Sequence, residues 1–524
     1  MAEWHDALEE LEQRRAVAAA MGGEERIARQ HERGRLTVRE RLALLLDQDS
    51  WREIGGLSGR VEYDPGGQRC FTTSNVVIGQ GRIDDRPVAI QADDFTVRGG
   101  AGDAGTFRKQ AYPERMAREL GIPLVRLVDG TGGGGSVKNL LEMDRTYLPG
   151  GILGTEWQIV MDLDRVPVIS LALGPVAGLG AARLVASHVS IMVRGTSQIC
   201  VAGPAVAKAA LGEDLTIEEL GGWRVASQAG TVDLVADSEE HAFELARLTL
   251  SYLPQHRGDL PPRVEPAVDQ PSVVDALRAM VPQDRRMPYD IRPILAAVFD
   301  EGSVLELGRA FGPSTITALA RLDGFAVAVV ASDPRIYAGA ITADGSDKLT
   351  RFIDLADNFQ LPVVHLVDQP GFLVGGAAER AGTIRRGARV LSALNATSIP
   401  WASVILRKVF GVGGAAHQPR GRHTFRVAWP SADWGSLPIE GGLEVAYRRE
   451  LDQAGEEAPE LKARILDQLE AVRSPFRSAE AFDIEDIIDP AETRLRLLEW
   501  VASSYMAMDA HRYERVAPNR KMRP

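Results

Sequence analysis

The chain has 524 residues, and its composition sets the first limits on what it can be. One hydrophobic core rarely serves more than about 250–300 residues, so at least two cores are expected. Hydrophobic residues make up 45% and charged residues 25%, which is typical of a globular protein and argues against a disordered chain. A net charge of −12 disfavours nucleic acid and anionic membranes as partners. Small molecules and other proteins are the predicted partners.

The first residues, MAEWHDALEELEQRR, predict a helix of mixed charge that is too acidic for a signal or transit peptide. Two cysteines, Cys70 and Cys200, exclude a disulfide framework and a zinc site with four cysteine ligands. The weakly polar stretch that begins at Val166 contains Pro175 and Arg183, so it does not predict a membrane span. We therefore expect a cytoplasmic protein whose cysteines only pack.

An internal repeat organises the chain. RIDDRPVAIQADD from Arg82 matches RLDGFAVAVVASD from Arg321, at an offset of 321 − 82 = 239 residues. The same offset continues without a gap and pairs Gly132 with Gly371. Each copy predicts a strand, a glycine-containing loop, a helix (FRKQAYPERMARELG or SDKLTRFIDLADNFQ) and a second strand (PLVRLVD or PVVHLVD). This is the pattern of a right-handed β-α-β crossover.

The second strand of each copy is nearly all apolar, as expected for a parallel strand covered by helices. The predicted fold class is therefore α/β, with two tandem lobes related by internal duplication. Proline and charge cluster over residues 253–272, where periodicity lapses. We place the domains at 1–262 and 263–524.

Four glycine loops each follow an apolar strand: DGTGGGG from Asp129, GPVAGLGAA from Gly174, DQPGF from Asp368 and FGVGGAA from Phe410. Backbone N–H groups in such loops can point at a ligand oxygen and form an oxyanion hole. The alternative is that these glycines only satisfy turn geometry or close packing. Two such loops in each of two duplicated lobes favour the functional interpretation.

The sequence has no HExxH, CxxC or GxSxG motif, and no dinucleotide or P-loop pattern in a strand-to-helix setting. No metal is predicted in this subunit. His188, His365 and His417 lie near the loops, but we interpret them as packed or solvated residues. A site of backbone donors suits a reaction with an enolate intermediate, in which the cofactor provides the base.

Most of the chain resembles the carboxyltransferase subunits of acyl-CoA carboxylases, including the propionyl-CoA and methylcrotonyl-CoA enzymes. The segments that carry the resemblance are RLTVRERLALLLDQDSWREIG from Arg35, IMVRGTSQICVAGPAVAKAALGEDLTIEELGG from Ile191, MPYDIRPILAAVFDEGSVLELG from Met287, RRGARVLSALNATSIPWASVILRKVFG from Arg385 and EDIIDPAETR from Glu485.

The resemblance implies two crotonase-like lobes in a hexamer, in which the first lobe of one subunit faces the second lobe of another. CoA would lie mainly on the first lobe and biotin on the second. In the family's mechanism, carboxybiotin releases CO2, the ureido nitrogen takes a proton from the thioester, and the enolate attacks CO2 through its α (or vinylogous γ) carbon. The implied donors are Gly132, Gly133, Gly178 and Leu179 for one carbonyl oxygen, and Gly371, Phe372, Val412 and Gly413 for the other.

Departures from the family pattern leave the substrate open. The usual DSGGAR loop is DGTGGGG here and the usual AGGA is AGLG from Ala177, so the donors can shift by one residue. The loop GVGGAAH from Gly411 is nearer to the methylcrotonyl type, and Ala415 stands where propionyl-type enzymes carry a substrate-selecting Asp. WGSLPIEGG from Trp434 also differs from the usual VMGAEGA.

No AMKM biotinylation motif and no ATP-grasp segment occur, so the resemblance implies a biotin carboxylase and a biotin carboxyl carrier on other chains. Two alternatives remain open. A biotin-dependent decarboxylase subunit shares both lobes and runs the transfer in the opposite direction, and a non-catalytic scaffold would keep the fold alone. Neighbouring genes for a biotin carboxylase or for a multi-span membrane protein would separate the two enzymes.

Overall fold

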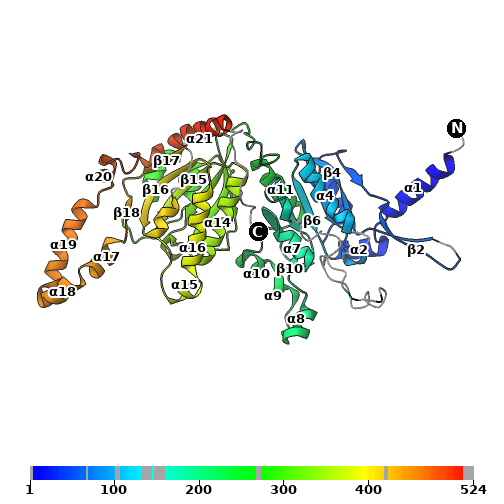
Figure 1. The fold of residues 1–524 in the computed structure, drawn as a ribbon, viewed down its shortest axis with the longest axis horizontal. Helices are drawn as coiled ribbons and strands as arrows, with labels where there is room; N and C mark the ends of the chain where they lie inside the picture. Colours follow the sequence, from blue (N-terminus) through cyan, green and yellow to red (C-terminus); the bar gives the residue numbers. More distant parts are fainter. Residues whose placement is uncertain are drawn as a thin grey trace. The chain divides into compact units, whose positions relative to one another are not determined.

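The computed structural model describes residues 4–66, 69–100, 107–130, 144, 146, 160–266, 273–417 and 423–511. The chain folds as two compact units, divided between Asp259 and Leu260. Each unit contains one large, mostly parallel sheet with helices packed against it (Figure 1).

The sheet of the first unit has the strand order β1-β4-β5-β6-β7-β9-β11. The first two pairings, β1 with β4 and β4 with β5, are antiparallel, and all later ones are parallel. These strands are β1 Arg52–Ile54, β4 Val76–Ile83, β5 Arg86–Asp93, β6 Leu124–Val128, β7 Val168–Ala172, β9 Val189–Val193 and β11 Leu234–Ala236. Two small sheets are added, β2 Gly59–Tyr63 with β3 Arg69–Thr73, and β8 Pro175–Ala177 with β10 Gln198–Cys200.

The helices of the first unit begin and end at recognisable signals. For example, the third helix starts at a capping box in which the side chains of Thr37 and Glu40 each accept the other's backbone N–H. The helix predicted at the N-terminus is confirmed as α1. The helices are α1 His5–Ala19, α2 Glu24–Glu32, α3 Val38–Leu45, η1 Arg98–Gly100, α4 Phe107–Leu120, α7 Leu179–Val185, α8 Pro204–Leu211, α9 Ile217–Gly221, α10 Trp223–Gln228 and α11 Glu239–Tyr252.

The sheet of the second unit has the order β12-β13-β14-β15-β16-β17-β19, with β18 paired to the end of β16. Again the first two pairings are antiparallel and the rest parallel. The strands are β12 Leu305–Leu307, β13 Thr315–Leu322, β14 Phe325–Ser332, β15 Val363–Gln369, β16 Trp401–Phe410, β17 Thr424–Ala428, β18 Asp433–Gly435 and β19 Asp486–Ile487.

The second unit contains helices between its strands and a long helical segment after β18. The helices of the whole unit are η2 Val273–Ala276, α12 Leu277–Met280, α13 Arg292–Val298, η3 Tyr337–Gly339, α14 Ala343–Asn358, α15 Gly376–Arg380, α16 Thr383–Ala396, η4 Val412–His417, α17 Ile439–Ala446, α18 Arg448–Ala454, η5 Gly455–Glu457, α19 Ala458–Val472, α20 Pro475–Glu480, η6 Pro490–Glu492 and α21 Thr493–Ala510.

The duplication predicted at an offset of 239 residues is confirmed strand by strand. β5 runs from Arg86 to Asp93 and β14 from Phe325 to Ser332, which is an offset of 325 − 86 = 239. The register of the next pairing also repeats, since Ala89 faces Leu124 in one unit and Ala328 faces Val363 in the other. The predicted α/β architecture is therefore present twice.

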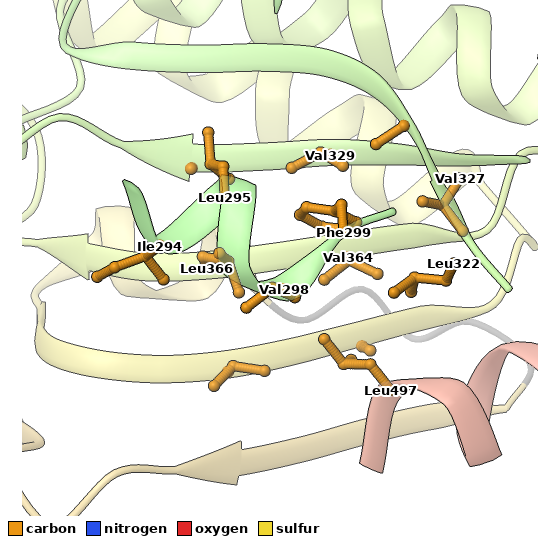
Figure 2. Packing of buried hydrophobic residues seen from close by; sticks show 14 of the residues in the cluster. Ile294, Leu295, Val298, Phe299, Leu322, Val327, Val329, Val364, Leu366 and Leu497 are labelled. Carbon is orange, nitrogen blue, oxygen red and sulfur yellow. The ribbon is translucent and has the colours of Figure 1, made fainter. Parts of the chain in front are cut away.

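The core of the second unit shows how the sheet is held rigid (Figure 2). Leu295 and Phe299, from the segment of α13, pack with Val364 and Leu366 of β15, and α21 contributes Leu497. All five are at most 2% exposed. Burying a side chain of this size stabilises the fold by about 1.5–3 kcal/mol, so the strand ends provide a firm base for the loops that follow them.

No helix among the described residues is both long enough and apolar enough to cross a membrane.

Candidate active site

The first glycine loop of interest links β8 to α7. Gly178, between them, has φ 59 and ψ −126, a conformation that residues with a side chain rarely adopt. Its N–H donates to the carbonyl oxygens of Cys200 at 3.3 Å and Val201 at 3.1 Å, at the end of β10. The N–H of Gly178, predicted as a donor to the ligand, is therefore already occupied by hydrogen bonds within the fold.

Leu179 is the first residue of α7, so its N–H has no acceptor within the helix. Gly180 follows it in the same first turn. Among the described residues, none accepts a hydrogen bond from either of these N–H groups. Within the described part of the chain, both N–H groups are therefore candidate donors to a ligand oxygen.

The second unit repeats this loop, again with a glycine at positive φ. Gly411 follows β16 with φ 63, and its N–H donates to the carbonyl oxygen of Gly435 in β18 at 3.0 Å. Val412 then begins η4. The offset from Gly178 to Gly411 is 411 − 178 = 233, which is also the offset from Val168, the first residue of β7, to Trp401, the first residue of β16 (401 − 168 = 233).

The repeat therefore matches Leu179 with Val412 and Gly180 with Gly413. In each loop the first glycine donates to the small added strand, and the next two N–H groups have no acceptor in the described part of the chain.

The two predicted loops of the second unit meet at Gly413. A Cβ atom on Gly413 would lie 2.8 Å from Cα of Gly371 and 3.0 Å from N of Phe372, so no side chain fits between the loops. Gly371 itself has φ 109, and its Cβ would lie 3.0 Å from the carbonyl oxygen of Phe410. The structure thus brings together Gly371, Phe372, Val412 and Gly413, the four residues predicted for the second lobe.

The backbone of Phe372 lies beside Ile341, and its ring packs against α16. Ile341 donates to the carbonyl oxygen of Gly371 at 3.0 Å and accepts from the N–H of Leu373 at 2.9 Å, which leaves the N–H of Phe372 without an acceptor among the described residues. The ring packs on Gly387 of α16, where a Cβ atom would come within 2.5 Å of it.

Gly132 and Gly133, predicted for the first lobe, lie outside the described residues. Gly130, the last described residue before them, has φ 153 and packs so closely on Gly100 that a Cβ atom would lie 2.7 Å from Cα of Gly100. Ala415, predicted as the selectivity residue, lies in η4 three residues after Val412.

The model of the carboxyl transferase domain family matches residues 29–522. The chain belongs to this family. It is 35% identical over 503 residues to the propionyl-CoA carboxylase carboxyltransferase subunit of Haloferax mediterranei, covering 94% of this chain and 95% of that protein. It is 31% identical over 523 residues to the methylmalonyl-CoA decarboxylase subunit alpha of Veillonella parvula, covering 99% of each.

Among solved structures, the transcarboxylase 12S hexamer with methylmalonyl-CoA and methylmalonic acid bound superposes with a TM-score of 0.84 at 31% identity, over 97% of this chain and 96% of that one. The prediction of two tandem crotonase-like lobes is confirmed. The chain is a carboxyltransferase of the kind found in biotin-dependent acyl-CoA carboxylases.

A buried carboxylate lies at the base of one glycine loop in each carboxyltransferase lobe. Asp129, after β6, is bound by Arg41 at 2.7 Å and by Arg35 at 3.2 Å. Its repeat partner Asp368, in β15, is bound by Arg407 at 3.0 Å. Burial raises the pKa of the Asp368 carboxyl, and the charge of Arg407 opposes this shift.

Both carboxylates therefore anchor the strand end from which a glycine loop starts. The repeat at offset 239 already paired them, but their partners were not predicted, because the arginines come from distant parts of the chain.

The histidines near the loops pack as predicted where their side chains are described. His188 is fully buried, with Nδ1 accepting from the N–H of Val168 at 2.9 Å and Nε2 lying 3.0 Å from the carbonyl oxygen of Leu163. His365 is 3% exposed and lies edge-on to the ring of Trp401, with centroids 6.0 Å apart. Among the described residues, no group of three or more His, Cys, Asp or Glu is placed to hold a metal ion.

Proposed function

We propose that this chain is the carboxyltransferase subunit of a biotin-dependent acyl-CoA carboxylase. The observation that carries the proposal is the matched pair of loops. In each lobe, directly after a glycine at positive φ, two N–H groups have no acceptor among the residues that the structure describes. A carboxyl transfer between biotin and a thioester involves one carbonyl oxygen on each reactant. Each of these oxygens needs hydrogen-bond donors to stabilise the charge that develops on it.

In the first lobe (1–262), the N–H groups of Leu179 and Gly180 hold the thioester carbonyl oxygen as it gains charge in the enolate. This shifts the predicted pair by one residue, because the N–H of Gly178 is already bonded to the end of β10. Fixed amide dipoles need no reorganisation when the charge develops, so they stabilise the enolate more than water would. Gly132 and Gly133 remain the proposed helpers.

In the second lobe (263–524), the N–H groups of Val412 and Gly413 hold the ureido oxygen of biotin. The N–H of Phe372 adds to them, since its nitrogen lies beside Gly413. When bound, carboxybiotin supplies the carboxyl group and its ureido nitrogen supplies the base for the thioester proton. No titratable side chain of this chain is then needed to remove that proton.

Ala415 is the proposed acyl-selecting residue, because it follows these donors within η4. The segment from Trp434 is the second candidate for this role. It includes Gly435, whose carbonyl oxygen accepts from the N–H of Gly411, so the segment borders the same loop.

A biotin carboxylase and a biotin carboxyl carrier on other chains complete the proposed reaction. We also propose a hexamer in which the first lobe of one subunit faces the second lobe of another. The transcarboxylase 12S structure is described as a hexamer assembly, and this chain shares its fold over nearly the full length, which supports the proposal of a hexamer.

The test is purification of the chain with its biotin-bearing partner, followed by an assay that depends on ATP and bicarbonate. Acetyl-, propionyl-, methylcrotonyl- and longer acyl-CoA would be compared by incorporation of labelled bicarbonate. Absence of incorporation with every thioester, from a complex whose biotin becomes carboxylated, would refute the proposal.

A decarboxylase subunit is the second candidate, favoured by the 31% identity to the Veillonella parvula protein over 99% of both chains. It predicts carboxyl transfer from a carboxylated thioester to biotin, without ATP, and a membrane partner in place of the biotin carboxylase. Co-purification distinguishes the two, because only one of these partners would bind the chain.

A further inference from the structure

We infer that Gln369 is a positioning residue that holds the second-lobe donor loop in place through its side-chain amide. The inference deepens the proposed function and rests on it for the identity of the reaction. Gln369 is the last residue of β15 and is 1% exposed. Its Nε2 donates to the carbonyl oxygen of Gly413 at 3.0 Å, across 44 residues of sequence.

The orientation of this amide is determined by its partner. A carbonyl oxygen can only accept, so Nε2 and not Oε1 must face Gly413. Oε1 is then left buried, with no hydrogen-bond partner in the described part of the chain. A buried acceptor without a partner destabilises a fold, and such atoms in native proteins call for a functional or structural reason.

The bond closes a clamp around the donor loop. On one side, the main chain at Gly371 and Phe372 leaves no room for a side chain on Gly413. On the other side, Gln369 holds the carbonyl group of the same residue. The strand register shifts between Val367 and Gln369, an irregularity of the kind that re-aims a side chain at the end of a strand.

At the repeat position, the first lobe has no glutamine that could form this clamp. The repeat places Gly130 at the position of Gln369 (369 − 239 = 130), and glycine has no amide to offer. Gly130 packs on Gly100 instead. The clamp acts on the second loop, whose donors we assign to biotin, so its loss should impair that half of the site and leave the binding of the CoA moiety intact.

Gln369→Met keeps the side-chain length and removes the amide. Preorganised donors lose effect when they become mobile, so we expect kcat to fall by about 10- to 100-fold while the KM for acyl-CoA stays within about twofold. Hydrogen exchange of residues 411–417 should become faster in this variant.

The matched control is Gln91→Met. Gln91 is 2% exposed, its Nε2 donates to the carbonyl oxygen of Gln110 at 2.8 Å, and its Oε1 is also buried without a partner among the described residues. It has the same bonding pattern in β5 of the first unit, and in the described part of the chain it makes no hydrogen bond with residues 411–417. Gln91→Met should lose comparable stability but keep kcat and the exchange rate of residues 411–417.

Gln369→Glu tests the same bond without depending on the stability of the Met variant. A protonated carboxyl can donate to the carbonyl oxygen of Gly413, whereas a carboxylate cannot. Relative to the parent, its kcat should therefore recover as the pH falls through the pKa of the introduced group. If the ratio of the kcat of Gln369→Glu to the kcat of the parent does not change with pH, the inference is overturned.

Unchanged kcat and exchange in Gln369→Met, or an equal loss in Gln91→Met, would overturn it as well. The parent protein could prove inactive while hydrogen exchange of residues 411–417 still becomes faster in Gln369→Met and not in Gln91→Met. That result would refute the proposed function but would establish the clamp.

Discussion

The assignment of the first-lobe donors can be tested by removing a single N–H group. Leu179→Pro does this with little cost to the helix, because Leu179 is the first residue of α7 and its N–H has no acceptor within the helix. The preceding Gly178 has no Cβ to clash with the proline ring, and its backbone is outside the helical region. The fold should therefore tolerate the change.

Loss of one oxyanion donor typically lowers kcat by about 10²- to 10³-fold, or about 2.7–4 kcal/mol of transition-state stabilisation. We expect this loss for Leu179→Pro. Leu179→Ala keeps the N–H and removes most of the half-buried side chain, so it reports the cost of the side chain alone and should stay within a few-fold of the parent.

The assay is ATP- and bicarbonate-dependent carboxylation with the reconstituted complex, alongside thermal unfolding and calorimetric binding of CoA. CoA affinity should change little in either variant. If folded Leu179→Pro turns over within about threefold of Leu179→Ala, the N–H of Leu179 does not stabilise the transition state and the alignment of the two loops is not functional.

Three further outcomes are expected. Ala415→Ile should lower the ratio of kcat/KM for a bulky acyl-CoA to that for acetyl-CoA by about 10- to 200-fold, since one or two methylenes of lost fit are worth that much; an unchanged ratio would point to the segment from Trp434 instead. Burial and a hydrogen bond with Glu114 raise the pKa of Asp162 to about 8. Between a pH of about 4 and about 8 the folded protein therefore keeps a proton that the unfolded chain has released, so the free energy of unfolding should fall as the pH rises through this range. Asp162→Asn should flatten that fall in thermal unfolding, and an unaltered slope would contradict the assignment. Sedimentation should show at least a dimer, because the two proposed half-sites come from facing lobes of different subunits; a fully active monomer would disprove this arrangement.

Much of the fold followed from local patterns in the sequence. The repeat at offset 239 predicted both β5 and β14, since a run of mostly apolar residues is encoded within each strand, and both strands are buried over most of their length. The two helices predicted after these strands are confirmed as α4 and α14. The assignment of CoA to the first domain and biotin to the second stays a prediction.

By itself the sequence determined the family, the duplicated α/β architecture and the glycine loops proposed to carry the donors, because these depend on short-range patterns and on glycines at fixed spacing. Only the tertiary structure decided which loop N–H groups are hydrogen-bonded within the described part of the chain. The N–H of Gly178 is taken up by Cys200 and Val201, and Gln369 holds Gly413 from another strand. Such hydrogen bonds join residues far apart in the chain, and their geometry exists only after the strands have paired.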